Sequence, residues 1–160
     1  MLLKSRLTEQ EYINASFVLL YSKPFIKIIT GMIFLLLVVI IVTAVALPEA
    51  SFSQGIFPVV MLIVIPLMTY LTAKRSYASN KIISESVEYN FENDFLSIKG
   101  ESFNAQLSWE KMFKVTKTKN WVFIWQNKQV ANPISRRLIS DAEISFLKEI
   151  LDRHKVKNDL

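Results

Sequence analysis

The chain has 160 residues, of which 51% are apolar, and its formal net charge is +5. That apolar share is high for a soluble domain of this length, and most of it is concentrated in two stretches. Residues 1–81 hold seven basic and three acidic side chains, whereas residues 82–160 hold twelve and eleven. The positive balance therefore belongs to the part with the apolar stretches, and no nucleic-acid partner is expected.

Residues 1–24 form an N-terminal segment that we expect to be helical. Thr8 followed three residues later by Glu11 is a capping-box pattern, in which each residue satisfies a backbone group of the other at a helix start. The polar positions carry Glu and Gln rather than a row of Lys, which disfavours an autonomous membrane-binding helix. The sequence therefore predicts a short helix on the membrane surface or packed on the C-terminal domain.

Residues 25–81 are expected to form a transmembrane helical hairpin with spans at 25–47 and 56–73. The first span contains one charge, Lys27, and the second contains none. As helices they would be roughly 34 Å and 27 Å long, close to the hydrocarbon thickness of about 30 Å. Both are apolar on all sides, whereas a helix in a soluble core needs a polar face, so a buried soluble hairpin is disfavoured.

The connection between the spans, Pro48–Gly55, is short enough to require an antiparallel hairpin with both chain ends on one side. Seven basic residues lie on the flanks, counting Lys27 one turn inside the first span, and the connection has none. The positive-inside rule therefore predicts a multi-pass protein with cytoplasmic N- and C-termini. The spans contain no Asp, Glu, Arg or His, which argues against a pump or transporter.

From Ile82 onward the apolar period changes to two, which is typical of β-strands. Strands are expected in SVEYNF, FLSIK, FNAQLSW, KMFKVTKTK and WVFIWQ and over Lys128–Asn132, with polar turns between them. The side chains expected to point inward from the first four are Val87, Tyr89, Phe91, Leu96, Ile98, Phe103, Ala105, Leu107, Trp109, Phe113 and Val115. WVFIWQ is apolar on both faces and predicts a strand covered on both sides.

An amphipathic helix is predicted at the C-terminus. Ser140 and Glu143 form a second capping-box pattern, and an apolar stripe follows at helical spacing. An antiparallel sheet closed by one such helix is the plan of a pleckstrin-homology-like (PH-like) domain, expected here over residues 82–160. The predicted fold class is thus membrane α+β: a two-helix transmembrane hairpin, then a small antiparallel-β PH-like domain closed by the C-terminal helix.

Four stretches resemble the YcxB-like family of bacterial membrane proteins. They are LTEQEYI, SVEYNFENDFLSIKG, LSWEKMFKVTKTKNWVFIW and NPISRRLISDAEISFLKEIL. The most characteristic features are the Ser108–Trp109 pair and the run P-x-x-R-R-x-[IL] before the final helix. The resemblance implies a segment before a two-helix hairpin, a C-terminal PH-like domain and a location in the bacterial cytoplasmic (inner) membrane. It implies no established activity and supplies no catalytic residues.

The sequence contains no constellation that indicates an enzyme. It has no Cys and a single His, His154, which suits the end of the final helix, where a cation interacts favourably with the helix dipole. Three glycines, without a Gly-rich motif, make no phosphate-binding loop. We therefore expect no catalytic, cofactor-binding or metal-binding residues and no cofactor. The three tryptophans are interpreted as core or membrane-interface residues rather than as the lining of a ligand groove.

Arg136, Arg137, Lys114 and Lys117 form the candidate lipid or partner surface. Each basic group near an anionic leaflet contributes roughly 1 kcal/mol, so a few could hold the domain on the membrane. The alternative interpretation is ordinary solvated charge, since acidic residues are interspersed among the basic ones.

The expected function is a membrane-anchored cytoplasmic interaction or regulatory module, not an enzyme. Its expected partners are the lipid bilayer and another membrane or membrane-associated protein, and a homo-oligomer stays open. Two alternatives remain: a domain that binds anionic lipid headgroups, and an accessory subunit of a membrane transport or enzyme complex.

Overall fold

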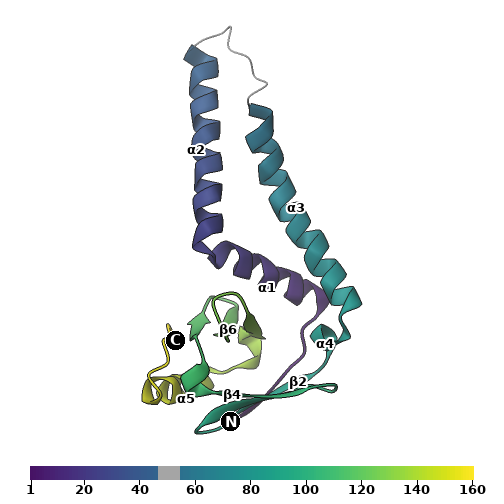
Figure 1. Ribbon diagram of the computed structural model, residues 1–160, viewed down its shortest axis with the longest axis vertical. Coiled ribbons are helices and arrows are strands. Elements are labelled where there is room, and N and C mark those ends of the chain that lie inside the picture. The colour runs from purple at the N-terminus through teal and green to yellow at the C-terminus, as the bar shows by residue number, and fades with distance from the viewer. Residues whose placement is uncertain (47–54) are drawn as a thin grey trace. The chain divides into compact units, whose positions relative to one another are not determined.

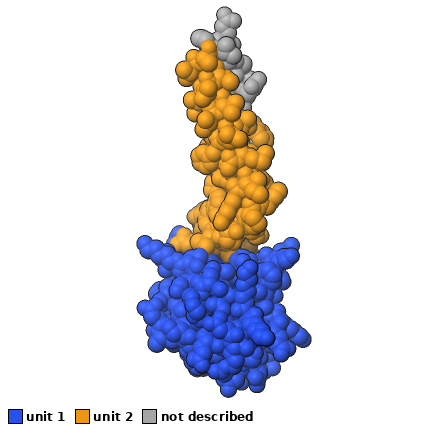
Figure 2. Space-filling view, turned by 90° about the vertical axis from the view of Figure 1, so that its left-hand side faces the viewer, with its two compact units in different colours: residues 1–11, 80–160 blue, residues 12–79 orange. Residues whose placement is uncertain are grey.

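The computed structural model of the protein describes residues 1–46 and 55–160 (Figure 1). These residues form two compact units, shown in different colours in Figure 2. Unit 1 comprises residues 1–11 and 80–160, and unit 2 comprises residues 12–79. Most of the predicted Pro48–Gly55 connection lies outside the described residues, as does Leu47 at the predicted end of the first span.

Unit 2 contains the two apolar helices that the sequence predicts. Helix α2 spans Pro24–Ala46 and helix α3 spans Ile56–Ser79, and both are long and apolar enough to cross a membrane. Pro24 opens α2, where its missing N–H leaves no bond unmade. In α2 no residue of the most apolar stretch is buried, and in α3 only 11% are. Both predicted apolar helices are therefore confirmed as helices.

Helix α1, Glu9–Ser22, begins in unit 1 and continues into unit 2. Its start matches the predicted capping box: the Thr8 N–H and hydroxyl donate to the Glu11 carboxylate at 3.0 and 3.1 Å, and the Glu11 N–H donates back to Thr8 Oγ1 at 3.3 Å. Within unit 2 the rings of Tyr12 and Tyr77 lie 6.0 Å apart, so α1 contacts α3.

The first sheet of unit 1, sheet A, consists of β1 (Leu2–Ser5), β2 (Val87–Phe91), β3 (Phe95–Lys99) and β4 (Asn104–Ser108), in that order and all antiparallel. β1 is a strand that the sequence analysis did not predict. It pairs with β2, with Leu3 opposite Tyr89. Leu3 and Ser5 are buried, while Leu2 and Lys4 point to solvent. The sheet therefore includes residues from both sides of the hairpin.

The second sheet, sheet B, consists of β5 (Lys114–Lys117), β6 (Trp121–Trp125) and β7 (Ala131–Ser135), also antiparallel. All five residues of the central strand β6 are buried, which confirms the prediction from its two apolar faces. β7 is an edge strand, which tolerates the missing N–H of Pro133. The predicted last strand, Lys128–Asn132, is wrong by about three residues, because Asn127 forms a turn by accepting bonds from the N–H groups of Gln129 and Val130.

Two residues predicted to point inward are exposed instead. Phe113 is 41% exposed, whereas its neighbour Met112 is 7% exposed. The reason is a single turn of 3-10 helix, η2 (Trp109–Lys111), which interrupts the alternation before β5 begins. Ala105 is also exposed, since it lies on β4, an edge strand of sheet A.

Helix α5, Asp141–Arg153, closes unit 1 and carries the predicted capping box of Ser140 and Glu143. Its stripe of Ile144, Leu147, Ile150 and Leu151 is buried with residues of both sheets. Burial of each such side chain contributes roughly 1.5–3 kcal/mol, so this core stabilises the unit. Small antiparallel sheets followed by one C-terminal helix thus confirm the coarse fold expected for this part of the chain.

The chain after α5 returns to sheet B. The N–H of Val115 donates to the Lys157 carbonyl at 2.9 Å, and the Asp159 N–H donates to the Val115 carbonyl at 3.3 Å. The Asp159 carboxylate also accepts the backbone N–H of Lys117 at 2.5 Å. The C-terminal residues therefore cover the outer edge of β5, which would otherwise present unpaired backbone groups.

Candidate functional site

The four basic residues of the candidate surface do not all lie together. Arg136 and Arg137 occupy η3 (Arg136–Leu138), a 3-10 turn directly after β7. β7 ends opposite Trp121 and the Arg136 N–H donates to the Asn120 carbonyl at 2.9 Å, so this turn lies at the end of sheet B that also carries Lys117. Lys114 pairs with Trp125 at the other end of the sheet.

Arg136 holds the start of helix α5. Its guanidinium donates to the Ile139 carbonyl and to the Asp141 carboxylate. Asp141 lies in the first turn of α5, where negative charge is favoured by the unpaired N–H groups of the helix start. Arg136 thus already has partners within its own unit.

Arg137 holds the start of helix α1 in a similar way. Its Nε donates to Glu11 Oε1 at 2.8 Å, and a terminal nitrogen donates to Glu11 Oε2 at 3.2 Å. This two-pronged geometry is the one in which a guanidinium binds a carboxylate most strongly. The hydrogen bond from Arg137 is the main reason why the pKa of Glu11 is lowered, and the same contact raises the pKa of Arg137.

Lys114 lies over an aromatic row on the outer face of sheet B. Its ammonium is 4.9 Å from the centre of the Trp125 ring, within range of a cation–π interaction. The Trp125 Nε1–H donates to Thr116 Oγ1 at 2.9 Å. The strand register places Trp121, Phe123 and Trp125 on the face opposite the core, with successive ring centres 6.2 and 6.3 Å apart.

Trp109 belongs to the core, as one of the two interpretations of the tryptophans predicts. It is fully buried, and its indole N–H donates to the Glu92 carbonyl at 3.0 Å. Its ring is stacked with those of Phe91 and His154, with ring centres 6.3 and 6.5 Å apart. His154 Nε2 is 2.7 Å from the Asn93 carbonyl oxygen, so this ring links the end of α5 to the turn after β2.

A second set of contacts holds the chain where it returns from unit 2. Residues 80–86, here called the return segment, include the single helical turn α4 (Lys81–Ser84). Arg6 Nε donates to the Ser84 carbonyl at 3.2 Å, and the Glu85 carboxylate accepts the Ser102 N–H at 2.9 Å and its hydroxyl at 2.5 Å. The bonds from Ser102 lower the pKa of Glu85.

Gly100 makes the Glu85 contact sterically feasible. A Cβ at this position would collide with the Phe103 ring and lie 2.8 Å from the Glu85 carboxylate. A larger residue here would therefore displace either the turn between β3 and β4 or the carboxylate that holds the return segment.

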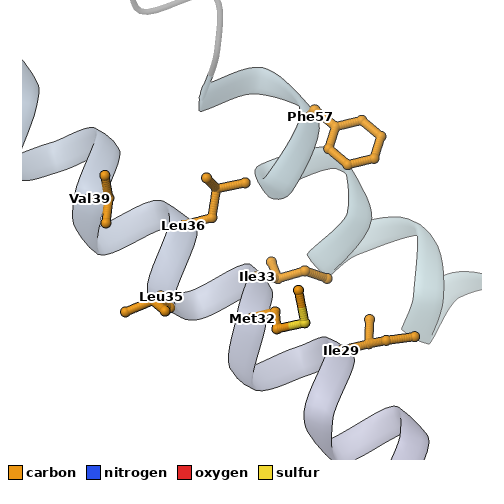
Figure 3. A pocket seen from close by; sticks show the side chains of 7 residues that line it. All are labelled: Ile29, Met32, Ile33, Leu35, Leu36, Val39 and Phe57. Atoms are coloured by element: carbon orange, nitrogen blue, oxygen red, sulfur yellow. The ribbon is translucent and has the colours of Figure 1, made fainter.

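Unit 2 carries an apolar groove of about 450 Å³ (Figure 3). Ile29 and Ile33 extend from α2 toward α3, and Phe57 is the lining residue that α3 contributes. The lining residues are Ile29, Met32, Ile33, Leu35, Leu36, Val39 and Phe57. Because all of these side chains are apolar, the groove suits an acyl chain or another apolar side chain and offers no group for catalysis.

Among the described residues, no group of three or more His, Cys, Asp or Glu side chains is placed to hold a metal ion. Sequence analysis did not predict that Glu11 binds a distant arginine. Its capping-box role was predicted, but its partner Arg137 is 126 positions away, and no local pattern connects them.

Comparison with protein families matches residues 91–151 to the family described as YcxB-like protein. This range runs from the last residue of β2 into the final turns of α5 and includes both arginines of η3. Neither the comparison with curated proteins nor that with solved structures found a match. The resemblance to the YcxB-like family that the sequence motifs indicate is thereby confirmed over residues 91–151.

Proposed function

We propose that the protein is a membrane-anchored interaction or regulatory module. In this proposal α2 and α3 cross the bacterial inner membrane as a hairpin, and unit 1 is a cytoplasmic PH-like domain that recognises a membrane or membrane-associated protein. The anchor would raise the effective concentration of the domain near such a partner.

The pairing of β1 with β2 is the observation that carries this proposal. β1 precedes the two apolar helices and β2 follows them, yet the two strands pair over four residues. Leu3 is buried in the same core as Leu96 and Leu147. Since a β-ladder cannot form across a bilayer, the pairing supports a hairpin whose two flanks lie in one compartment. The seven basic residues on those flanks favour the cytoplasm as that compartment.

The arrangement of unit 1 supports the PH-like part of the proposal. Two antiparallel sheets share a core that one amphipathic helix closes.

The exposed edge of sheet A offers a place for a partner, because domains of this size can bind partners by adding a strand to a sheet. β4 is such an edge: Asn104, Ala105 and Gln106 are exposed, and the strand carries no charged residue.

Fusion reporters test the topology. A reporter that is active only in the cytoplasm, fused to Met1 or to Leu160, is expected to be active in both positions. The same reporter placed in the 48–55 connection should be inactive and serves as the matched control. Activity at only one end would contradict the proposal, because β1 and β2 would then be separated by the membrane.

Photocrosslinking in the native membrane tests the interaction role. A photoreactive residue at Gln106 on β4 is expected to give an adduct of defined mass. The same residue at Phe34 of α2, which is 56% exposed, should mainly capture lipid. If Gln106 captures no protein while Phe34 captures lipid, the interaction role at β4 is refuted.

The exposed basic groups at one end of sheet B favour a second candidate, recognition of anionic lipid headgroups. Lys117 and Lys119 are exposed, and the Arg137 side chain is 59% exposed. The chain has no Cys, so a spin label at Lys117→Cys reports on this end alone. In vesicles containing anionic lipid its accessibility to water should fall, and salt should restore it. A label at Lys148→Cys on α5 is the control, and equal accessibility in neutral vesicles would refute lipid recognition.

A further inference from the structure

The edge strands of the two sheets in unit 1 are protected against further pairing to different degrees. Residues 157–159 cover the outer edge of β5, β7 contains Pro133, and β1 carries Lys4. A covering segment, a proline and a charged side chain are the usual means by which an edge strand avoids pairing with another chain. Within the described residues, β4 is the edge strand that has none of the three.

The hydrogen bonds that flank β4 show which of its backbone groups face outward. Phe103, just before the strand, accepts a backbone bond from the β3–β4 turn at 2.9 Å, and Trp109, just after it, donates one to the turn before β3 at 3.4 Å. Because bonded positions alternate along an antiparallel strand, the odd-numbered residues of β4 bond to β3. The outward N–H and C=O groups are therefore those of Asn104, Gln106 and Ser108.

The side chains of β4 are divided between the two faces of sheet A by polarity. Ala105 and Leu107 lie opposite core residues of β3, so they share the face that carries the core. Asn104, Gln106 and Ser108 occupy the other face with uncharged polar side chains. Ala105 is nevertheless exposed, so the apolar face of the sheet continues to its open edge.

We propose that the partner at β4 is a second copy of this chain, bound by antiparallel pairing of the two β4 strands about a twofold axis at Gln106. This inference rests on the proposed interaction role and names its partner. Gln106 is the middle residue of β4, so this register pairs the strand over its whole length. Each Gln106 then exchanges two backbone bonds with its counterpart, and one continuous sheet runs through both copies.

This register places similar side chains opposite one another. Asn104 lies opposite Ser108 of the second copy, so uncharged polar groups meet on one face. Ala105 lies opposite Leu107 of the second copy, so the exposed end of the apolar face gains an apolar neighbour. No like charges meet, which would disfavour the pairing. Two copies anchored in one membrane would also meet at a raised effective concentration.

Single cysteines on β4 test the register in the full-length protein in native membranes, because the chain has no Cys of its own. The Cα atoms of a bonded antiparallel pair are about 5.5 Å apart, which a disulfide can span. Under mild oxidation Gln106→Cys is expected to give a product of twice the chain mass. Its yield should be roughly tenfold above that of Asn104→Cys, whose counterpart lies about 13 Å away along the strand. Lys148→Cys, exposed on α5, measures random collision.

Charge substitutions at Gln106 provide a second test. Two differently tagged copies of the parent should purify together from detergent extracts. Gln106→Lys in both copies should lower this recovery roughly fivefold, and so should Gln106→Glu in both, because like charges then lie directly opposite each other. One copy with Gln106→Lys and one with Gln106→Glu should restore the recovery. Restoration separates a lost pairing from a failure to fold, and Lys148→Glu in both copies is the control without an expected effect.

The outcomes distinguish this inference from the proposed function. Cross-linking that is equal at Gln106, Asn104 and Lys148, or that is absent at all of them, overturns the inference, as does failure of the mixed charges to restore recovery. Capture of a different protein by the photoreactive residue at Gln106, without a product of twice the chain mass, overturns the inference and supports the proposed function. If that residue captures neither a second copy nor another protein, both are refuted.

Discussion

Unit 1 and the apolar helices of unit 2 are stabilised in different ways. Unit 1 buries its large apolar side chains among themselves, and Trp109, Ile124, Leu147 and Leu151 have no exposed surface. In α2, by comparison, Phe34, Leu35 and Ile41 are more than half exposed. A soluble surface rarely presents so continuous an apolar area. Unit 1 thus encloses its apolar side chains, whereas α2 leaves its own exposed, as a helix that crosses a membrane would.

This contrast predicts that unit 1 and α2 respond differently to two kinds of substitution. Removal of an apolar side chain should matter in unit 1 and hardly at all on the exposed faces of α2. Introduction of a charge should matter most where the surrounding medium is apolar. The following substitutions test the contrast in order of decreasing effect.

Trp109→Ala should have the largest effect, a loss of about 3–5 kcal/mol in the stability of unit 1. The substitution leaves a cavity between Phe91 and His154 and removes the donor to the Glu92 carbonyl. Hydrogen exchange of the β6 amides in the full-length protein measures the loss. Phe146→Ala, at a position that is 42% exposed on α5, is the control and should change stability by less than about 1 kcal/mol. Similar effects of both substitutions would contradict the assignment of Trp109 to the core.

Val39→Lys should disfavour membrane insertion of α2 by about 2.5–3.5 kcal/mol, because it places a charge near the middle of the helix. Membrane fractionation of the expressed protein measures this cost. Ile28→Lys, next to the existing Lys27, is the matched control, since a lysine near the helix end can extend to the headgroups. If Val39→Lys is found in the membrane fraction to the same extent as the parent, the idea that α2 lies in an apolar medium is contradicted.

Leu3→Ala should destabilise unit 1 by about 2–3 kcal/mol, although the residue is distant in sequence from the rest of the sheet. Its neighbour Leu2 is 57% exposed on the same strand, so Leu2→Ala provides a closely matched control with little expected effect. Protection of the β2 amides against hydrogen exchange is the measurement. Equal effects at the two positions would show that the burial of Leu3 does not stabilise unit 1 and that β1 is only loosely attached to sheet A.

Glu11→Gln should produce the smallest effect, and one that depends on pH. The pKa of Glu11 is lowered from its ordinary value of 4.5, chiefly by the hydrogen bond from Arg137. A carboxylate with a lowered pKa in the folded state contributes stability that is fully present above the unfolded pKa and is lost as the pH falls through the folded pKa. The stability difference between parent and Glu11→Gln should therefore shrink below about pH 4.5.

The same dependence should be weaker in Arg137→Ala, because the main cause of the lowered pKa of Glu11 is gone while the bonds from Thr8 remain. Hydrogen exchange at several pH values, corrected for the intrinsic exchange rate, gives the comparison. A difference between parent and Glu11→Gln that stays constant from about pH 7 to pH 3 would show that the ion pair does not contribute to stability.

The elements that could be predicted from the sequence are those with a local signal. Thr8 with Glu11 and Ser140 with Glu143 mark two helix starts, and both capping boxes are present. Apolar runs of membrane-spanning length and the alternation in SVEYNF predict their elements equally directly. In each case the residues that determine the helix or strand are close together in the sequence, so the element can be predicted without knowing what the rest of the chain does.

The features that could not be predicted depend on distant partners or on small interruptions. β1 is four residues long and is a strand only because β2 pairs with it. Phe113 is exposed and its neighbour Met112 is buried instead, because one 3-10 turn shifts the alternation of inward and outward side chains. Arg137 was a reasonable candidate for an external anion, yet in the structure its guanidinium binds Glu11. No local pattern distinguishes an arginine with an internal carboxylate partner from one without.

The pairing of β1 with β2 also sets an order of events on the ribosome. β1 is made first, then both long helices, and only afterwards the strand on which Leu3 will be buried. At roughly 5–20 residues per second, the newly made N-terminus waits on the order of several seconds for its partner. During that interval β1 has no partner strand and Leu3 is exposed, and the nascent domain remains one strand short.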